Sequence, residues 1–263
     1  MSYQTIDYAV AAGIARLTLN RPERLNSFNT LMHQEVRHAL TALAADTEAR
    51  VLILTGAGRG FCAGQDLGDR ASVPAGAPAD LGESIERYYN PLILMLRRLP
   101  LPVIAAVNGV AAGAGANIAL ACDLVLAARS ASFVQAFARI GLVPDCGGTW
   151  FVPRLVGAAR AMGLALLGEK LPATQAAQWG LIWRCLEDDE FGPEVDSLAE
   201  RLAAAPTRAL ARAKQLIWQS ANRTLEQQLD AERDAQRELG YSADYAEGVA
   251  AFIDKREPRF TGR

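Results

Sequence analysis

Histidine is scarce in this chain of 263 residues, which contains only His33 and His38. The two lie five positions apart on an expected helix, whereas side chains that share one helix face are spaced three or four apart. This spacing does not suit a metal site, so we expect no metal ion. With no histidine beside a recognisable motif, we expect no metal hydrolysis and no Ser-His-Asp or Cys-His nucleophile. Both histidines are expected at the surface.

A disulfide framework is missing as well. The four cysteines form no C-x-x-C pair and lie far apart, at Cys62, Cys122, Cys146 and Cys185. Dispersed cysteines of this kind are typical of buried, reduced thiols. They indicate a reducing compartment rather than a secreted scaffold.

The chain also lacks an excess of charge of one sign and a long apolar run. Its 27 basic and 29 acidic residues give a net charge of −2, so no basic field would attract a nucleic acid or an anionic membrane. The N-terminal segment MSYQTIDYAV has no signal-peptide pattern, and no uninterrupted apolar run reaches the ~18 residues that span a bilayer. We expect a cytoplasmic protein without a nucleic-acid or membrane partner.

Apolar residues are abundant, at 51% of the chain, and can build a large core. Runs rich in β-branched residues at 50–56, 102–109 and 122–128 predict buried strands. Between them lie helical patterns, one capped by Asn29 and another from about Gly82 to Leu99. The order of strand, strand and helix repeats, which predicts an α/β fold.

Beyond about Pro193 the chain consists of helix formers, interrupted at Pro206, at Asn222 and near Gly240. Thr224 and Gln227 match a capping box that opens one of these helices. We therefore divide the chain into a core, 1–192, and a helical C-terminal oligomerisation region, 193–263. The apolar stripe of this region requires a partner surface, either the core or another subunit.

Two glycine-rich turns follow expected strands, one in GAGRGFCAGQDLGDR and one in NGVAAGAGANIALACD. Small residues there leave the backbone N–H groups of Ala63 and Ala114 free to point outward. Two such donors that converge make an oxyanion hole. Each turn by itself is equally well explained by close packing of a helix on a strand. GAGRG also resembles a dinucleotide fingerprint, but its third glycine and the following helix are misplaced.

Asp145 is the only acid in the segment ARIGLVPDCGGTW. A lone carboxylate in apolar surroundings is a candidate for proton transfer. The alternative is that Asp145 caps a helix that begins at Cys146 or Gly147. The loop-like stretch 71–82, rich in Pro, Ala and Gly, is expected to be mobile and to lie over a site.

Five segments in order carry a family resemblance: NRPERLNS, GRGFCAGQDL, AVNGVAAGAG, GLVPDCGGT and SADYAEGVAAFIDKREPRFTG. In sequence and spacing they resemble the enoyl-CoA hydratase/isomerase (crotonase) family over essentially the whole chain. The resemblance implies a spiral of ββα units with a helical C-terminal region, assembled as a homotrimer or a dimer of trimers. It also implies an acyl-CoA substrate, with coenzyme A as part of the substrate and no other cofactor.

The resemblance further implies that the N–H groups of Ala63 and Ala114 hold the thioester oxygen. The other residues that it assigns to substrate binding are Arg24, Cys62, Gly64, Gln65, Asp66, Leu67, Gly113, Asn117, Phe137 and Lys255. Asp66 and Asp69 are expected mainly to cap a helix after the first turn, and Lys255 is expected to reach the phosphates of coenzyme A.

The hydratases of this family carry two glutamates, and the matching positions here are Asn117 and Phe137. Neither side chain can carry a proton, so addition of water is disfavoured. Asp145 matches the position of the acid/base carboxylate in the isomerase branches. One carboxylate is sufficient for a 1,3 proton shift while the oxyanion hole holds the charge.

Within the family, the runs NRPERLNSFN, LTGAGRGFCAGQDL, PDCGGTW and RAMGLALLG resemble a branch that acts in phenylacetate catabolism. This implies conversion of 2-(1,2-epoxy-1,2-dihydrophenyl)acetyl-CoA to the oxepin-CoA, together with a 3,4- to 2,3-double-bond shift in dehydroadipyl-CoA. A pocket edged by Phe137, Trp150, Tyr88 and Tyr89 would suit a ring, although aromatic residues at these spacings are equally often core.

Alternatives from the same class are a general Δ3-Δ2-enoyl-CoA isomerase and an enoyl-CoA hydratase. A dehalogenase or thioesterase with Asp145 as nucleophile is disfavoured, because no histidine lies near a motif to activate water. A non-catalytic acyl-CoA or RNA-binding scaffold is the alternative from another class. The acidic pI of about 5.8 argues against its RNA-binding form.

Overall fold

The structure is a computed structural model that describes residues 2–68 and 80–263. Its strands form two sheets, a six-stranded sheet in the order β1-β2-β3-β5-β7-β10 and a four-stranded sheet in the order β4-β6-β8-β9. The strands are β1 (Ile6–Ala11), β2 (Ile14–Leu19), β3 (Val51–Gly56), β4 (Gly60–Cys62), β5 (Val103–Val107), β6 (Val110–Ala112), β7 (Leu124–Ala128), β8 (Ser132–Val134), β9 (Lys170–Pro172) and β10 (Arg184–Leu186). The expected strands at 50–56, 102–109 and 122–128 are therefore confirmed as β3, β5 and β7.

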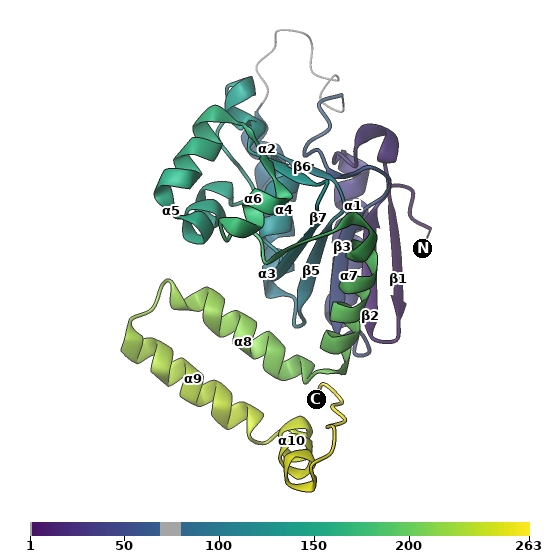
Figure 1. Cartoon of the computed structure of the whole chain (residues 1–263), viewed down its shortest axis with the longest axis vertical. Helices are drawn as coiled ribbons and strands as arrows, with labels where there is room; N and C mark the ends of the chain where they lie inside the picture. Colours follow the sequence, from purple (N-terminus) through teal and green to yellow (C-terminus); the bar gives the residue numbers. More distant parts are fainter. Residues whose placement is uncertain (1, 69–79) are drawn as a thin grey trace.

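β1 and β2 form an antiparallel pair at one edge of the larger sheet, and from β3 to β8 the core repeats a strand–strand–helix unit in which successive strands join different sheets (Figure 1). β3, β5 and β7 pair in parallel in the larger sheet, while β4, β6 and β8 pair in parallel in the smaller one. A helical segment follows each pair of strands. This is the spiral of ββα units that the resemblance implies.

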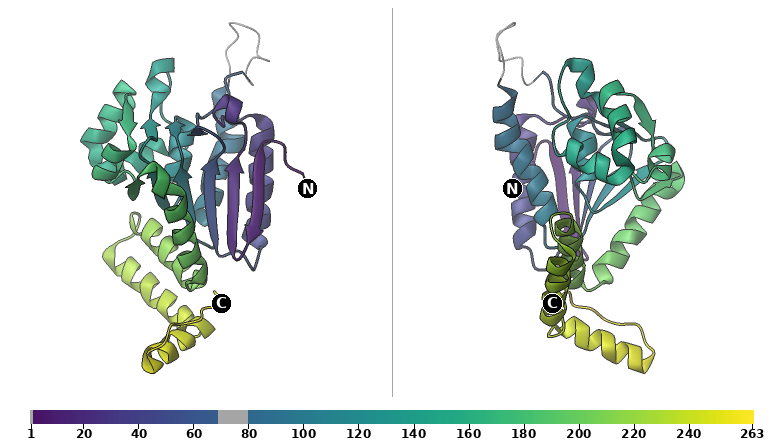
Figure 2. Two further views of the ribbon diagram at one scale, coloured as in Figure 1. Left: turned by 45° about the vertical axis from the view of Figure 1, so that its right-hand side comes forward. Right: turned by 90° about the vertical axis from the view of Figure 1, so that its left-hand side faces the viewer.

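The central strand β3 is buried on both faces, which its successive residues cover alternately. Val51 and Ile53 of β3 pack with Val195 of helix α7 (Asp188–Ala204) in one apolar cluster. Leu52 and Leu54, their immediate neighbours, belong to the cluster that includes helices α1 (Thr30–Ala45) and α3 (Asn90–Arg98) on the other side. Figure 2 shows α1 and α7 along the larger sheet. This two-sided burial explains why β3 is apolar without alternation.

The core contains ten described helical segments, of which α1 and the run from α2 to α3 match the two helices expected between the strands. The ten segments are η1 (Pro22–Arg24), α1 (Thr30–Ala45), α2 (Leu81–Ser84), η3 (Ile85–Tyr89), α3 (Asn90–Arg98), α4 (Ala114–Leu120), η4 (Ala136–Ile140), α5 (Gly148–Leu167), α6 (Ala173–Gln178) and α7 (Asp188–Ala204). The side chain of Asn29 accepts a hydrogen bond from the Met32 N–H, which confirms the predicted cap of α1. The expected helix from Gly82 to Leu99 is a continuous run of α2, a π-helical turn η3 and α3.

The C-terminal region contains α8 (Thr207–Ser220), α9 (Leu225–Leu239) and α10 (Ala243–Asp254) and no described strand. The capping box of Thr224 and Gln227 is present at the start of α9. The predicted boundary at 193 is wrong, because Pro193 lies inside α7 and Val195 of the same helix packs on the sheet. The core therefore extends through α7, and α8 to α10 project from it as a separate arm (Figure 2).

A buried ion pair fastens this arm to the core. The ammonium of Lys214 on α8 lies 2.8 Å from the Asp123 carboxylate and donates to the carbonyl oxygens of Leu96 and Leu101. Burial lowers the pKa of Lys214, and the charge of Asp123 opposes that effect. Asp123, which also accepts the Val103 N–H, is therefore a structural residue.

Helix α5 is the one helix among the described residues that is long and apolar enough, by length and composition, to cross a membrane. It carries Pro153 and is interrupted by non-helical backbone at Gly157, and Phe151 and Val152 are buried in the apolar core. Only 22% of its apolar window is buried, and Met162, Leu166 and Leu167 near its end are exposed.

Candidate active site

Three parallel strands of the smaller sheet end side by side. Residues near the carboxyl ends of β4, β6 and β8 are paired in register, Cys62 with Ala111 and Ala112 with Val134. The chain leaves these strands at Ala63, Gly113 and Gln135. Ligands of parallel sheets bind outside the carboxyl ends of the strands. Both glycine-rich turns lie at this edge.

Close approach of the backbone requires glycine in both turns. Gly64 has a φ of +91°, and a Cβ there would lie 3.0 Å from the Ala112 carbonyl oxygen and 3.3 Å from the Ala114 nitrogen. A Cβ at Gly115 would lie 2.2 Å from the Cys62 carbonyl oxygen. Any side chain at these positions would force the two turns apart. The predicted meeting of the two turns is therefore confirmed.

The N–H group that the sequence analysis assigned at the first turn is not the available one. The Ala63 N–H donates to the Leu25 carbonyl oxygen at 2.9 Å, so this assignment is corrected. Phe28 and Gln65 form a parallel bridge, in which the Phe28 N–H bonds the Gly64 oxygen and the Asp66 N–H bonds the Phe28 oxygen. The N–H of the bridged residue Gln65 points away from Phe28. Gln65 therefore presents the outward donor of this turn.

At the second turn Ala114 is the first residue of α4, after Gly113 with a φ of 54°. The N–H groups of the first helical turn have no acceptor within their own helix. The partial positive charge of the helix N-terminus adds to the attraction of an anion at this position. The geometry therefore agrees with the predicted role of the Ala114 N–H.

The side chain of Gln65 is hydrogen-bonded to the buried residue Tyr89. The Tyr89 hydroxyl donates to Gln65 Oε1 at 2.8 Å, and Tyr89 is 1% exposed. The ring of Tyr89 meets the His33 ring edge-on with centroids 4.4 Å apart, and Phe28 and Tyr88 pack on the same imidazole. The expectation that His33 lies at the surface is wrong, because helix α1 turns it into this aromatic cluster. His38 is exposed as expected.

The expected aromatic pocket is only partly assembled. Phe137 is buried, and a Cβ at Gly113 would lie 3.6 Å from its ring, so Phe137 borders the second turn. Trp150 instead stacks on Trp218 of α8, with ring centroids 5.4 Å apart. Trp150 therefore contributes to attachment of the C-terminal arm rather than to a ring pocket beside Phe137.

Asp145 lies in the loop between η4 and α5. Helix α5 begins at Gly148 with Gly147 as its N-cap residue, so a helix start at Cys146 or Gly147 is excluded. The Asp145 carbonyl oxygen accepts the Gly148 N–H at 2.8 Å. Cys146 has a φ of +50°, an uncommon conformation for a residue with a side chain. Burial, with the neighbouring Asp145 charge, raises the pKa of the Cys146 thiol.

Asn117 is not exposed to a substrate, which corrects its assignment to substrate binding. It is 0% exposed, and its amide bonds with the side chain of Gln135 and the carbonyl oxygen of Asp145. Gln135 is a site residue that the sequence reasoning missed. It stands as a polar residue within the apolar segment SFVQAFARI, a signal that could have been used.

Asp66 also has a structural partner, since its carboxylate lies 2.8 Å from the Arg21 guanidinium and accepts the Gly68 N–H. Burial acts to raise the pKa of Asp66, but the hydrogen bonds from Arg21 and Gly68 outweigh it and lower the pKa. Arg24 and Leu67, which flank this pair, are exposed. Asp69 and residues 71–79 of the expected mobile loop lie outside the described residues.

The cysteines and the metal-ligating residue types add no further site. Cys62, Cys122 and Cys146 are buried thiols, Cys185 is half-buried, and all four are free, as expected. The Cys62 thiol accepts the Gly64 N–H, and burial raises its pKa to about 12. Within residues 2–68 and 80–263, no group of three or more His, Cys, Asp and Glu side chains is placed to hold a metal ion.

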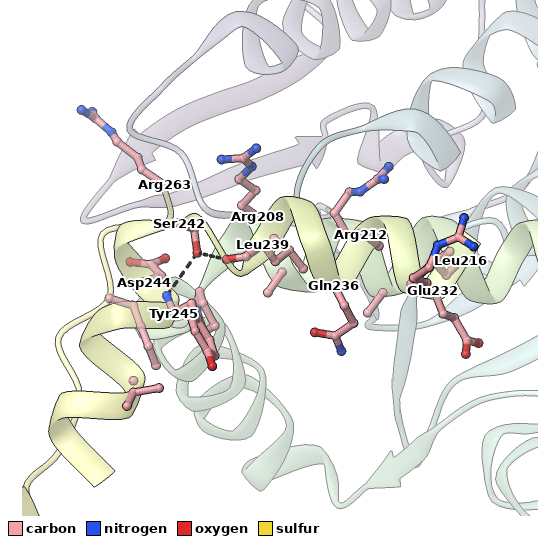
Figure 3. Close-up of a pocket in the computed structure, with 18 of the residues that line it drawn as sticks. Arg208, Arg212, Leu216, Glu232, Gln236, Leu239, Ser242, Asp244, Tyr245 and Arg263 are labelled. Carbon is pink, nitrogen blue, oxygen red and sulfur yellow. Dashed lines mark hydrogen bonds between the residues drawn. The ribbon is translucent and has the colours of Figure 1, made fainter. Parts of the chain in front are cut away.

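Lys255 ends α10, at the far end of the arm from the strands β4 and β6 (Figure 1). The expected contact of Lys255 with coenzyme A stays a prediction, and within a single chain α10 does not bring Lys255 to the two glycine turns. A cavity of about 820 Å³ lies between α8, α9 and α10 (Figure 3), and its lining includes Leu216, Leu229 and Phe252. Each arginine that lines this cavity has an acidic partner: Arg208 and Arg212 pair with Glu238, Arg233 with Asp234, and Arg263 with Glu48. Because these guanidinium groups are already paired and much of the lining is apolar, the cavity does not resemble an anion site.

Comparisons with known proteins agree with this arrangement. Residues 9–263 match the enoyl-CoA hydratase/isomerase family. The chain is 58% identical to the 1,2-epoxyphenylacetyl-CoA isomerase of Escherichia coli K12 over 97% of both chains. It is 51% identical, over the full length of both, to a probable enoyl-CoA hydratase of Rhodobacter capsulatus. The solved structure of an enoyl-CoA hydratase from Bacillus anthracis has a TM-score of 0.91 at 33% identity, covering 99% of this chain and 100% of that one. The fold, the paired glycine turns and these likenesses together place the chain in the enoyl-CoA hydratase/isomerase family.

Proposed function

We propose that this protein is an acyl-CoA isomerase that moves a proton between two carbons of a thioester enolate. The observation that carries the proposal is the contact between the two glycine turns, joined by the Asn117 side chain to the backbone of Asp145. The outward N–H groups of Gln65 and Ala114 and the loop that carries Asp145 therefore belong to one site.

The N–H groups of Gln65 and Ala114 hold the thioester oxygen. Removal of the proton next to the thioester places negative charge on that oxygen, and donors aimed at it stabilise the enolate more than the ground state. Both donors belong to backbone that glycine contacts keep rigid. They therefore need little rearrangement as the charge develops.

Asp145 is the base and then the acid. Its carboxylate takes the proton from the carbon next to the thioester, and the electron pair of that C–H bond forms the enolate. The protonated Asp145, which can exchange its proton with solvent, then delivers a proton to a carbon two positions away as the double bond moves. Atoms and charge balance without water or a further cofactor.

The acyl group is the ring epoxide of phenylacetyl-CoA, which the reaction converts to the oxepin-CoA, with a 3,4- to 2,3-double-bond shift in dehydroadipyl-CoA as a second reaction. The likeness to the Escherichia coli isomerase supports this substrate, and Phe137 offers a ring face beside the second turn. A general Δ3-Δ2-enoyl-CoA isomerase would use the same residues. Hydration has less support, because Asn117 is committed to buried hydrogen bonds and Phe137 carries no proton.

The protein works in the cytoplasm as a homotrimer or a dimer of trimers. Apolar side chains of the arm are exposed to solvent, with Phe252 85% exposed and Ile253 70% exposed. Neighbouring apolar residues of this kind mark an interaction surface. Packing of the arm on another copy would cover them and would allow Lys255 to approach that copy's substrate. Light scattering on a Phe252→Asp, Ile253→Asp protein should give a smaller particle than the unaltered chain, and an unchanged mass would contradict this assembly.

The test of function compares the unaltered protein with Asp145→Asn in heavy water. Each receives a 3-enoyl-CoA and, separately, the ring-epoxide phenylacetyl-CoA, and double-bond position and deuterium next to the thioester are followed. Loss of a general base costs about 10²–10⁴ in rate. Isomerisation and deuterium uptake should fall together in the variant.

Two results would count against this function. One is normal isomerisation by Asp145→Asn, which would mean that another group carries the proton. The other is hydration of a 2-enoyl-CoA by the unaltered protein at a rate comparable with isomerisation. Turnover of the 3-enoyl-CoA without the ring epoxide would instead support the general isomerase.

A further inference from the structure

Asn117 and Gln135 form a reciprocal pair of buried amides. Gln135 Nε2 donates to Asn117 Oδ1 at 2.7 Å, and Asn117 Nδ2 donates to Gln135 Oε1 at 3.3 Å. Asn117 Nδ2 also donates to the Asp145 carbonyl oxygen at 2.9 Å. Asn117 is 0% exposed and Gln135 is 5% exposed. Buried polar groups are retained where their hydrogen bonds are satisfied, as here.

The Asp145 carbonyl oxygen fixes which way the Asn117 amide faces, because a carbonyl can only accept and Asn117 Nδ2 must therefore point toward it. Asn117 Oδ1 then faces Gln135 and accepts from Gln135 Nε2, while Gln135 Oε1 accepts from Asn117 Nδ2. Gln135 thus bonds both ends of the Asn117 amide and holds it in the orientation that reaches Asp145. In this way Gln135 acts on Asp145 through Asn117.

The pair joins three separate segments of the site. Asn117 lies one helical turn after Ala114, about 4.5 Å along the axis of α4. Gln135 directly follows β8, whose Val134 carbonyl oxygen accepts the Gly113 N–H at 2.8 Å. The third segment is the loop with Asp145. The helix that carries the second oxyanion donor is thus tied to the loop that carries the base.

The Asn117 amide adds an attachment between the loop and helix α4. Cys146 is buried in the core, whereas Leu142 and Val143 are exposed, and Gly141 and Cys146 have positive φ angles. Glycine at position 148 leaves room for the Asn117 amide, because a Cβ there would lie 2.4 Å from Asn117 Nδ2. A larger residue at 148 would displace the amide or the loop.

We propose that the Asn117–Gln135 amide pair is a positioning device that sets the placement of Asp145 relative to the oxyanion turn. The inference rests on the proposed function, in which Asp145 is the base. In this arrangement Gln135 acts on Asp145 through Asn117 and does not itself carry the proton. A displacement of about 1 Å at a reacting group can cost about 10²-fold in rate. The pair therefore affects the rate of proton transfer rather than the binding of the thioester.

The experiment uses the full-length protein and Gln135→Met, which keeps the length of the side chain but removes its donor and acceptor. The matched control is Gln228→Met on α9, where Gln228 Nε2 donates to the Leu216 carbonyl oxygen. The readouts are deuterium exchange next to the thioester, KM for a 3-enoyl-CoA, and the infrared carbonyl stretch of the bound thioester. Thermal unfolding checks that each variant is folded.

Gln135→Met should slow exchange about 10- to 100-fold, with KM changed less than about threefold and the carbonyl stretch unchanged. The control should exchange normally. Combined with Asp145→Asn, Gln135→Met should add little further loss, because residues that act through one group are not additive. Asn117→Asp keeps the acceptor for Gln135 but loses the donor to Asp145. It should reproduce the slowing if Gln135→Met does not fold.

Normal exchange in both folded variants would overturn the inference. A full multiplicative loss in the double variant would also overturn it, because Gln135 would then act independently of Asp145. Asp145→Asn with full activity would remove the proposed function itself, and the inference with it. Low activity of Asp145→Asn beside normal activity of Gln135→Met would remove the inference alone.

Discussion

Gly64 and Ala114 lie so close that a Cβ at position 64 would approach the Ala114 nitrogen to 3.3 Å. The two residues belong to turns that follow different strands, β4 and β6, and parallel pairing of these strands brings them together. A small residue at 64 is therefore a condition for placing two backbone donors at one oxygen. The same contact explains why both turns are rich in glycine.

Replacement of Ala114 by proline should remove the oxyanion donor without stopping the helix. Ala114 is the first residue of α4, a position where proline is tolerated. Loss of one such donor should lower kcat by about 10²–10³. The control is Ala243→Pro, at the first position of α10 in the arm. A folded Ala114→Pro protein with full turnover would contradict the assignment.

A backbone ester at Gln65, which removes only the N–H, should distinguish Gln65 from Ala63 as the first donor. At Gln65 we expect kcat to fall by about 10²–10³. At Ala63 the ester removes the hydrogen bond to Leu25, so it should lower stability by about 0.5–1.5 kcal/mol. Turnover by the folded Ala63 ester should remain near normal. The opposite pattern would restore the assignment of Ala63.

Gly148→Ala should disturb the Asp145 loop, because the added Cβ would lie 2.4 Å from Asn117 Nδ2. We expect a loss of about 1–3 kcal/mol in the free energy of unfolding, the usual cost of overpacking. Proton exchange should also slow. Gly163→Ala, in the same helix, meets no atom within 4 Å and should leave stability equal or raise it. Urea unfolding of both variants is the measurement, and equal stabilities would contradict the predicted clash.

Asp66 should contribute a pH-dependent part of the stability through its pair with Arg21. The pKa of Asp66 is lowered in the folded protein, so its contribution is present above the unfolded pKa of about 3.9 and is lost as pH falls through the folded pKa. Asp66→Asn should therefore unfold more easily by about 1–2 kcal/mol at pH 7, the range for hydrogen bonds to a charged group. The difference should shrink below about pH 4. A large rise in KM with unchanged stability would instead favour contact with the substrate.

Local patterns identified the regular elements, because their causes are local. The apolar runs predicted β3, β5 and β7, and Asn29 and Thr224 marked the starts of α1 and α9. A cap or a buried strand is set by neighbouring residues, so it can be read from the chain itself. The order of the glycine turns likewise indicated the family.

Local sequence patterns did not locate the end of the core. Pro193 indicated a break, but α7 begins at Asp188 and continues through Pro193 to Ala204. Only packing of Val195 on the sheet shows that α7 belongs to the core. His33 was assigned to the surface for a similar reason, since its burial depends on Phe28 and Tyr89 from other segments.

The sequence by itself determined the strands, the caps, the paired glycine turns and the candidate carboxylate Asp145. Only the tertiary structure decided which N–H groups are available, because Leu25 occupies the Ala63 N–H and the bridge to Phe28 turns the Gln65 N–H outward. It also decided that Asn117 joins Gln135 to Asp145 instead of facing a substrate. The physical reason is that a local pattern sets the conformation of a segment, whereas a hydrogen-bond partner is set by packing of segments far apart in the chain.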